Sequence, residues 1–370
     1  MTLATRCALF RSPALARIRS TTTTHQFIIA TTTSMAFDDL ADDAIAFTIT
    51  SSDECSLHKP RGLAFDLHRG HLLVADDFGS SIKIYSSNDG SFVCKFGSRG
   101  NEPGQFLNPY GIAIDHQHDR IIIAEMLNHR LQLVSLIDHS FVSFIDEEQL
   151  AYPQDVAVDK HHQRIIAIDT SYPLHARSAI DLSFLFSTKG NRSGLNYPSS
   201  VAIDDDRHRI IVSDTNNHRV QVLSSIDGSF LFEFGSQGDQ PCQFYNPRGV
   251  CIANQGRIII ADFYNHRLQS FTHEGHHISS FACGIEKPFG VAFDEHRGLI
   301  AFSAGHQVHV IGANQWLADT FTWLVARLRY APRWMKQAVS TMTMIRSLVD
   351  DSNAMSMIPN ELLFEIFSYL

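Results

Sequence analysis

The chain has 370 residues, of which 44% are hydrophobic and 19% charged, and its formal net charge is −9. This apolar content supports a sizeable core and excludes a wholly disordered chain, and no run approaches the roughly 18 apolar residues of a membrane helix. Six cysteines in 370 residues are too few for a disulfide scaffold, and they include no Cys-x-x-Cys pair, so no zinc site is predicted from them.

Residues 1–37 differ in composition from the rest of the chain. They contain four arginines, no acidic residue and several runs of Ser and Thr. This composition is typical of an organelle transit peptide, and the alternative is a disordered leader. We expect a mitochondrial protein if this segment acts as a transit peptide, and a cytoplasmic protein otherwise.

Six segments between residues 60 and 311 repeat one plan, and the prolines that open them are 41 to 49 residues apart. Each segment has a short apolar strand, a polar turn, a second strand that ends near an acid in most copies, and an alternating third strand. In most segments a further turn leads to a fourth strand. Four antiparallel strands in about 45 residues predict one blade of a β-propeller. The opening residues are Pro60, Pro109, Pro153, Pro198, Pro247 and Pro288.

The sixth segment supplies only three strands, which end near residue 311. Residues 44–50 form an alternating stretch ahead of the first segment and match the fourth-strand position. We predict that this strand completes the last blade and removes the exposed edges of an open array. The expected domain is therefore an all-β six-bladed propeller over residues 38–311.

Three segments carry an Asn-His-Arg-x-Gln motif after the second strand, at residues 128–132, 217–221 and 265–269. The motif, its period and the strand plan resemble the NHL repeat over about residues 44–311. This resemblance implies a propeller like that of TRIM-NHL-type proteins, in which some members bind RNA. The third segment departs from the pattern, because Ser171-Tyr172-Pro173-Leu174 replaces the motif.

An acid and an arginine recur five residues apart around these turns. A carboxylate in this position can accept turn N–H groups or pair with the arginine, so we interpret the pairs as structural turn staples. The pairs are Glu125 with Arg130, Asp214 with Arg219, and Asp262 with Arg267.

Many of the 20 histidines lie in the turns between the first and second strands, on the face opposite the Asn-His-Arg turns. A metal site needs three or four converging ligands, and turns spread around a ring are not expected to converge. We therefore predict solvated loop histidines, no metal site and no cofactor. These histidines are His68, His116, His118, His161, His162, His208 and His296.

The residues that follow the repeated prolines and acids are expected to gather around the ring axis. Arginines beside aromatic side chains suit recognition of a peptide or of single-stranded nucleic acid. Residues 38–311 carry 21 basic and 34 acidic side chains, and this net charge of −13 opposes strong phosphate binding. The candidate partner-binding residues are Arg61, Tyr110, Gln154, Ser199, Arg248, Phe289, Phe78, Phe263 and Tyr264.

The C-terminal part follows a different pattern, with a helical linker predicted over 312–350 and a helix within 351–370. Residues 358–370 resemble the start of an F-box, the helical module that docks the Skp adaptor of cullin-type ubiquitin ligases. The resemblance covers about 13 residues and implies a truncated F-box-like helix. Its docking residues are Pro359, Leu362, Leu363, Ile366, Phe367 and Leu370.

Three functions remain open from the sequence. The first is a non-catalytic protein-interaction propeller that recognises substrates within a ubiquitin-protein ligase complex, and the second is an RNA-binding propeller. The third is a metal-dependent propeller lyase or hydrolase, which needs His, Asp or Glu at the axis. The positions after the prolines are Arg, Tyr, Gln, Ser, Arg and Phe instead, so we predict no catalytic residue.

Overall fold

The computed structural model describes residues 45–50, 56–145, 150–171, 174–188, 194–282 and 284–313, which all lie in one compact unit, Phe37–Leu370. The predictions for residues 1–37, for the helical linker beyond residue 313 and for the F-box-like stretch lie outside these residues. Among the residues described, no helix is both long enough and apolar enough to span a membrane.

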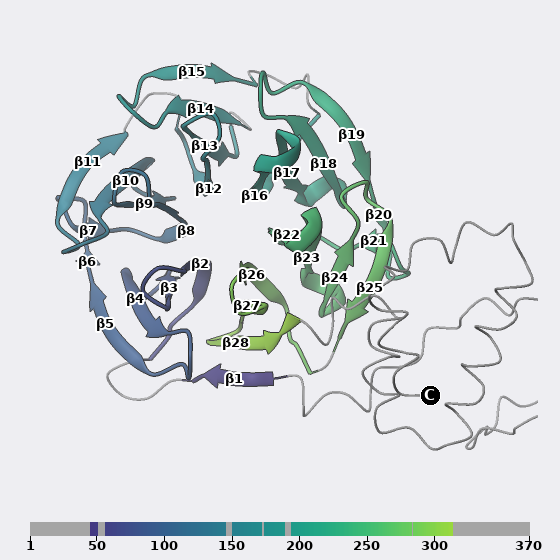
Figure 1. Ribbon diagram of the computed structural model, residues 1–370, viewed down its shortest axis with the longest axis horizontal. Coiled ribbons are helices and arrows are strands. Elements are labelled where there is room, and N and C mark those ends of the chain that lie inside the picture. Colours follow the sequence, from purple (N-terminus) through teal and green to yellow (C-terminus); the bar gives the residue numbers. More distant parts are fainter. Residues whose placement is uncertain are drawn as a thin grey trace, which may run out of the picture. The chain divides into compact units, whose positions relative to one another are not determined.

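Six four-stranded antiparallel sheets surround a central axis as the blades of a propeller (Figure 1). The innermost strands are β2 (Pro60–Asp66), β8 (Pro109–Asp115), β12 (Pro153–Asp159), β16 (Pro198–Asp204), β22 (Pro247–Ala253) and β26 (Pro288–Asp294). The second strands are β3 (His71–Asp76), β9 (Arg120–Glu125), β13 (Arg164–Asp169), β17 (Arg209–Asp214), β23 (Arg257–Asp262) and β27 (Leu299–Ala304).

The outer strands follow in the same order around the ring. The third strands are β4 (Ser81–Ser86), β10 (Arg130–Ser135), β14 (His175–Ser178), β18 (Arg219–Ser224), β24 (Arg267–Phe271) and β28 (Gln307–Gly312). The fourth strands are β5 (Phe92–Phe96), β11 (Phe141–Ile145), β15 (Phe184–Ser187), β19 (Phe230–Phe234), β25 (His277–Phe281) and β1 (Ile45–Ile49).

Short elements fill the connections between these strands. Two parallel pairs lie in loops between blades, β6 (Ser98–Arg99) with β7 (Gln105–Phe106) and β20 (Ser236–Gln237) with β21 (Gln243–Phe244). The 3-10 turns are η2 (Asp205–Arg207), η3 (Thr215–Asn217), η4 (Asn254–Gly256) and η5 (Phe263–Asn265).

The N-terminal strand closes the ring, as the sequence predicts. β1 pairs antiparallel with β28, with Thr48 opposite His309, and the last sheet has the order β1-β28-β27-β26. Figure 1 shows the purple β1 beside the yellow-green β28. The inner strands β26 and β2 are in contact, so the last blade packs against the first. The all-β six-bladed fold is therefore confirmed.

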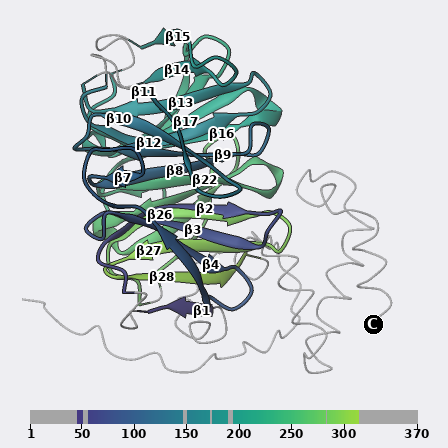
Figure 2. The same ribbon diagram turned by 90° about the vertical axis from the view of Figure 1, so that its left-hand side faces the viewer.

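The core lies between neighbouring blades, where both faces of each sheet are covered (Figure 2). One apolar cluster joins Ile82 and Leu73 of the first blade to Ile121 and Ile123 of the second. The second strands are buried on both sides, and the successive residues Ile121, Ile122 and Ile123 are all 0% exposed. This packing explains why these strands are continuously apolar rather than alternating.

The inner strands pass very close to one another around the axis. A Cβ atom added to Gly290 would lie 1.9 Å from the carbonyl oxygen of Arg61, and one added to Gly62 would lie 2.5 Å from that of Tyr110. The glycine two residues after the repeated proline is therefore needed for backbone approach. This close packing brings the residues at the start of each inner strand to the axis.

Candidate functional site

The acid of each motif turn holds together two loops of its blade. Asp262 is 0% exposed, and its Oδ2 accepts hydrogen bonds from Arg267 Nε at 2.9 Å and Asn265 Nδ2 at 2.9 Å. Its Oδ1 accepts the Tyr245 N–H at 2.8 Å, from the loop that leads into the inner strand. The other two pairs also lie within hydrogen-bond distance, Arg130 with Glu125 at 2.9 Å and Arg219 with Asp214 at 2.7 Å.

The motif histidines link the blades that carry them to the next blade. His218 and His266 have left-handed φ values of 54° and 55°. Their Nδ1 atoms accept the N–H groups of Asn246 at 3.1 Å and Lys287 at 3.2 Å, which lie just before the next inner strand. The sequence placed these histidines in turns but gave no sign of this inter-blade bond.

The turns between the second and third strands and the loops leading into the inner strands form one face of the ring, which we call the motif face. At its centre the guanidinium carbon of Arg61 lies 3.9 Å from the centroid of the Phe289 ring, and that of Arg248 lies 5.3 Å from it. The Tyr110 ring meets Phe289 edge-on at 5.4 Å. Residues from four different blades thus form one cationic and aromatic centre.

The candidate residues differ in how much they are exposed. Tyr110, Gln154 and Phe289 are 7%, 1% and 8% exposed, so they fill the axis rather than project from it. Phe78 and Tyr264 are 65% and 45% exposed. The physical reason is radial position, because the ring narrows toward the inner strands and leaves little room for side chains there.

The motif face carries other exposed apolar side chains that were not predicted from the sequence. They lie in the same turns and loops, and together with Phe78 and Tyr264 they surround the central Arg61–Phe289–Arg248 group. A sequence signal did exist, because three of them are tyrosines just ahead of the inner strands. These additional residues are Leu127, Tyr152, Tyr197 and Tyr245.

The two central arginines have different surroundings. Arg61 Nε donates a hydrogen bond to Asp77 Oδ2 at 3.3 Å, and burial raises the pKa of this aspartate. Arg248 Nε is buried and has no hydrogen-bond partner among the described residues. Burial also lowers the pKa of Arg248. An arginine remains protonated in proteins, so Arg248 offers a desolvated charged donor at the axis.

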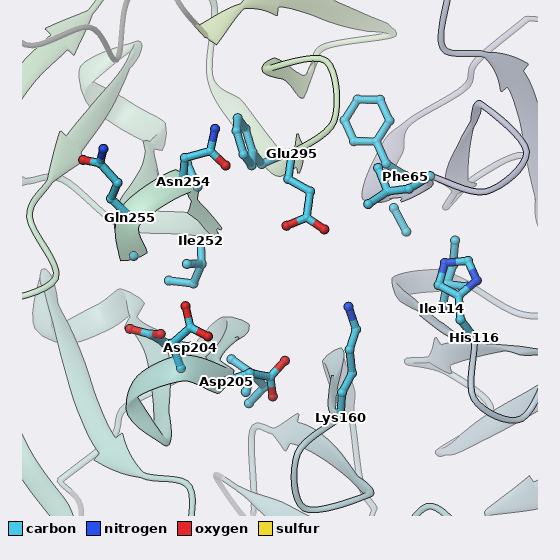
Figure 3. Close-up of a pocket in the computed structure, with 17 residues that line it drawn as sticks. Phe65, Ile114, His116, Lys160, Asp204, Asp205, Ile252, Asn254, Gln255 and Glu295 are labelled. Atoms are coloured by element: carbon cyan, nitrogen blue, oxygen red, sulfur yellow. The ribbon is translucent and has the colours of Figure 1, made fainter. Parts of the chain in front are cut away.

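The turns between the first and second strands form the opposite face, which we call the cavity face. A cavity of about 480 Å³ opens there, and charged side chains line it. Figure 3 shows Lys160, Asp204, Asp205 and Glu295 around this opening. Charges of both signs face the cavity, whereas the motif face has cationic and aromatic side chains at its centre.

The expectation that turn histidines stay apart is wrong for the cavity face. One side-chain nitrogen from each of His161, His162 and His208 lies within 4.8 Å of the others. The rings of His68 and His116, on the first two blades, are also only 4.2 Å apart between centroids. Turns of adjacent blades are neighbours near the axis, so histidines at equivalent positions come together.

Comparison with known proteins gives partial matches along the chain. A family model described as the NHL repeat matches residues 195–223 and 244–271, and one described as a 6-bladed beta-propeller matches 19–153. Protein brain tumor of Drosophila melanogaster is 31% identical over 196 residues, which cover 52% of this chain and 14% of that protein. The B-box type zinc finger protein ncl-1 of Caenorhabditis elegans is 30% identical over 192 residues, 52% of this chain and 17% of that protein.

The chain thus spans less than a fifth of the length of these two relatives. Among solved structures, a protein of unknown function from Bacteroides thetaiotaomicron matches with a TM-score of 0.54 and 13% identity. The match covers 70% of each chain. At this identity the likeness shows the fold alone.

Proposed function

Because the chain forms a six-bladed β-propeller of NHL repeats, related to TRIM-NHL proteins, we propose that it is a non-catalytic protein-interaction domain. Its motif face binds a peptide segment that presents a carboxylate to Arg248. Its role is to recognise substrates for ubiquitin-dependent degradation.

The observation that carries the peptide-binding proposal is the half-buried guanidinium of Arg248, which lies beside aromatic rings at the centre of a ring of exposed aromatic side chains. A guanidinium removed from water binds a carboxylate more strongly than an exposed one does, because the local dielectric is low. Exposed aromatic side chains such as Phe78 and Tyr264 supply the apolar contact area that anchors a protein partner.

RNA binding is a second candidate on the same face, and two lysine–aromatic pairs favour it. Lys59 Nζ lies 4.2 Å from the ring centroid of the exposed Phe78, and Lys287 Nζ lies 6.0 Å from that of Tyr264. Such pairs can stack bases and hold phosphates. The net charge of −13 over residues 38–311 opposes this function, so we favour the peptide.

The ubiquitin part of the proposal is supported by the resemblance of residues 358–370 to the start of an F-box. In this proposal the Skp adaptor binds Leu362, Leu363 and Ile366 while the propeller binds the substrate. The full chain should co-elute with purified adaptor in size-exclusion chromatography, and Leu363→Asp should abolish this. Absence of co-elution removes the ubiquitin role and leaves the peptide role standing.

The peptide role is tested by selecting binders to the full chain from a random peptide library and measuring their affinity. Selected peptides should contain Asp or Glu, and Arg248→Ala should weaken them at least tenfold. Glu295→Ala, on the cavity face, is the matched control and should leave affinity unchanged. The proposal would be contradicted if the selected peptides bound the Arg248→Ala variant as tightly as they bind the native chain.

Fluorescence anisotropy with a random single-stranded RNA oligonucleotide, measured over a range of salt concentrations, distinguishes RNA binding from peptide binding. We expect weak binding without a steep salt slope, since few phosphates are neutralised. Tight binding that falls steeply with salt and is lost in Lys59→Ala would favour RNA over the peptide.

A further inference from the structure

Three histidines from two neighbouring blades meet on the cavity face. His161 and His162 belong to the turn between β12 and β13, and His208 follows η2 in the turn between β16 and β17. The ring centroid of His208 lies 4.5 Å from that of His161 and 5.1 Å from that of His162. One nitrogen of each ring lies within 4.8 Å of the other two.

The tautomer of His162 is determined by a buried carboxylate. Asp159 is 1% exposed, and its Oδ2 lies 2.9 Å from His162 Nδ1. The Nδ1–H donates this bond, so the lone pair is on Nε2. A histidine that binds a metal is commonly oriented in this way, with its other ring nitrogen bonded to a carboxylate.

His208 provides a second, independent observation. Its Nδ1 is buried and has no hydrogen-bond partner among the described residues. Its backbone is held by its left-handed conformation (φ 53°, ψ 52°) and by its N–H, which donates to the Asp205 carbonyl oxygen at 3.4 Å. A buried imidazole nitrogen without a partner is unfavourable unless another group binds it.

We propose that His161, His162 and His208 form a binding site for a divalent transition-metal ion of the Zn²⁺ class. Three imidazole nitrogens are a ligand set that Zn²⁺ accepts, with water in the fourth position. Zn–N bonds of about 2.0–2.1 Å place the nitrogens roughly 3.4 Å apart, so the nitrogens must approach one another by up to about 1.4 Å. His161 is exposed and can turn to provide this movement.

The charges around the histidines favour a cation. Asp159 lies against His162, and Asp205 lies in the same turn as His208, so two carboxylates stand near the three rings and repel each other. A bound cation offsets this repulsion between carboxylates. The positive charge of Lys160 opposes cation binding in part, because Lys160 lies on the same turn as His161 and lines the cavity beside Asp205.

The ion would join the third blade to the fourth. The third repeat is one of the three without the Asn-His-Arg motif, since Ser171-Tyr172-Pro173-Leu174 replaces it, so it lacks the motif histidine that links a blade to its neighbour. A metal bridge on the cavity face supplies another link at that place in the ring. Metal binding should therefore raise the midpoint of thermal unfolding.

The test uses the full chain without an affinity tag, stripped of metal and titrated with ZnCl₂ by isothermal calorimetry. We expect one Zn²⁺ per chain, and affinity at least tenfold weaker in His161→Ala and in His208→Ala. The matched control is His296→Ala, which removes an exposed histidine from the equivalent turn of the sixth blade. It should retain the affinity of the native chain.

The visible absorption of bound Co²⁺ provides a second readout. Co²⁺ should give the visible absorption of a tetrahedral nitrogen-ligated site in the native chain and lose it in His161→Ala. If His208→Ala does not fold, the result for His161→Ala is sufficient, because His161 is exposed and its replacement should not disturb folding. Wild-type affinity in His161→Ala, or loss of binding in His116→Ala instead, would overturn the proposal.

Discussion

Asp155 shows how one side chain can depart from the repeat and be accommodated. It occupies the position at which four other inner strands have glycine, and it lies against Gly111 of the preceding blade. Its Oδ2 accepts hydrogen bonds from Ser200 Oγ at 2.7 Å and the Val201 N–H at 3.1 Å. Burial nevertheless raises the pKa of this carboxyl from 3.8 to about 6.

The raised pKa predicts a specific pH dependence for Asp155→Asn. The unfolded chain releases this proton near pH 4 and the folded chain only near pH 6, so native stability falls as pH rises between these values. The asparagine removes this loss because it does not ionise. We expect the stability of the variant relative to the native chain to rise by on the order of 1 kcal/mol between pH 4.5 and pH 7.5.

The measurement is urea unfolding of both chains at pH 7.5 and at pH 4.5. At pH 4.5 the carboxyl is protonated in the folded chain, so the advantage of the variant should shrink. An advantage of equal size at both pH values would show that ionisation of Asp155 is not its cause.

Among the structural elements, the Asn-His-Arg turn connects three parts of the structure. Its acid binds the loop that precedes the inner strand of its own blade, its arginine neutralises that acid, and its histidine binds the loop of the next blade. The motif therefore stabilises the relative positions of strands and blades. This geometry also positions the aromatic residues of the motif face.

Asp262→Ala tests this element. The substitution removes the buried acceptor of Arg267 Nε and of the Tyr245 N–H, and it leaves the Arg267 charge without its carboxylate. Loss of one partner of a buried ion pair costs about 3–5 kcal/mol in the free energy of unfolding. Denaturant unfolding measures the change directly.

Asp239→Ala is the control for this prediction. Asp239 is exposed, and among the described residues its carboxylate accepts a hydrogen bond only from the neighbouring Gln240 Nε2, at 2.7 Å. Its removal should change stability by less than about 0.5 kcal/mol. Similar losses in the two variants would contradict the assigned role of the turn.

At the scale of the whole molecule, stability depends on closing the ring. The last blade takes three strands from the end of the propeller and one, β1, from its start. Ile49 is 4% exposed and belongs to the cluster between the last and first blades. Without β1, the backbone edge of β28 and this cluster would both be open to solvent.

Deletion of residues 1–50 should therefore cause association and early unfolding, whereas deletion of 1–37 should not. Size-exclusion chromatography reports the association through the free edge of β28, and a thermal melt reports the loss of stability. A chain lacking residues 1–50 that stays monomeric and melts within about 2 °C of the native chain would contradict this role.

The sequence by itself determined the number of blades, the closing strand and the acid–arginine pairs. Each blade is a local unit whose strand pattern and turn residues repeat in the chain, so neighbouring positions in sequence are also neighbours in space. The docking residues of the F-box-like helix stay a prediction, since they lie outside the described residues.

Only the tertiary structure decided which residues from different blades meet. Arg61 and Phe289 are far apart in sequence, yet ring closure stacks them and places Arg248 on the same ring system. The same geometry buries Gln154 and Tyr110, which the sequence had assigned to a binding surface, and brings His208 to His161 and His162. The physical reason is radial distance: contacts across the axis and between blades depend on how tightly the inner strands pack, which no single repeat encodes.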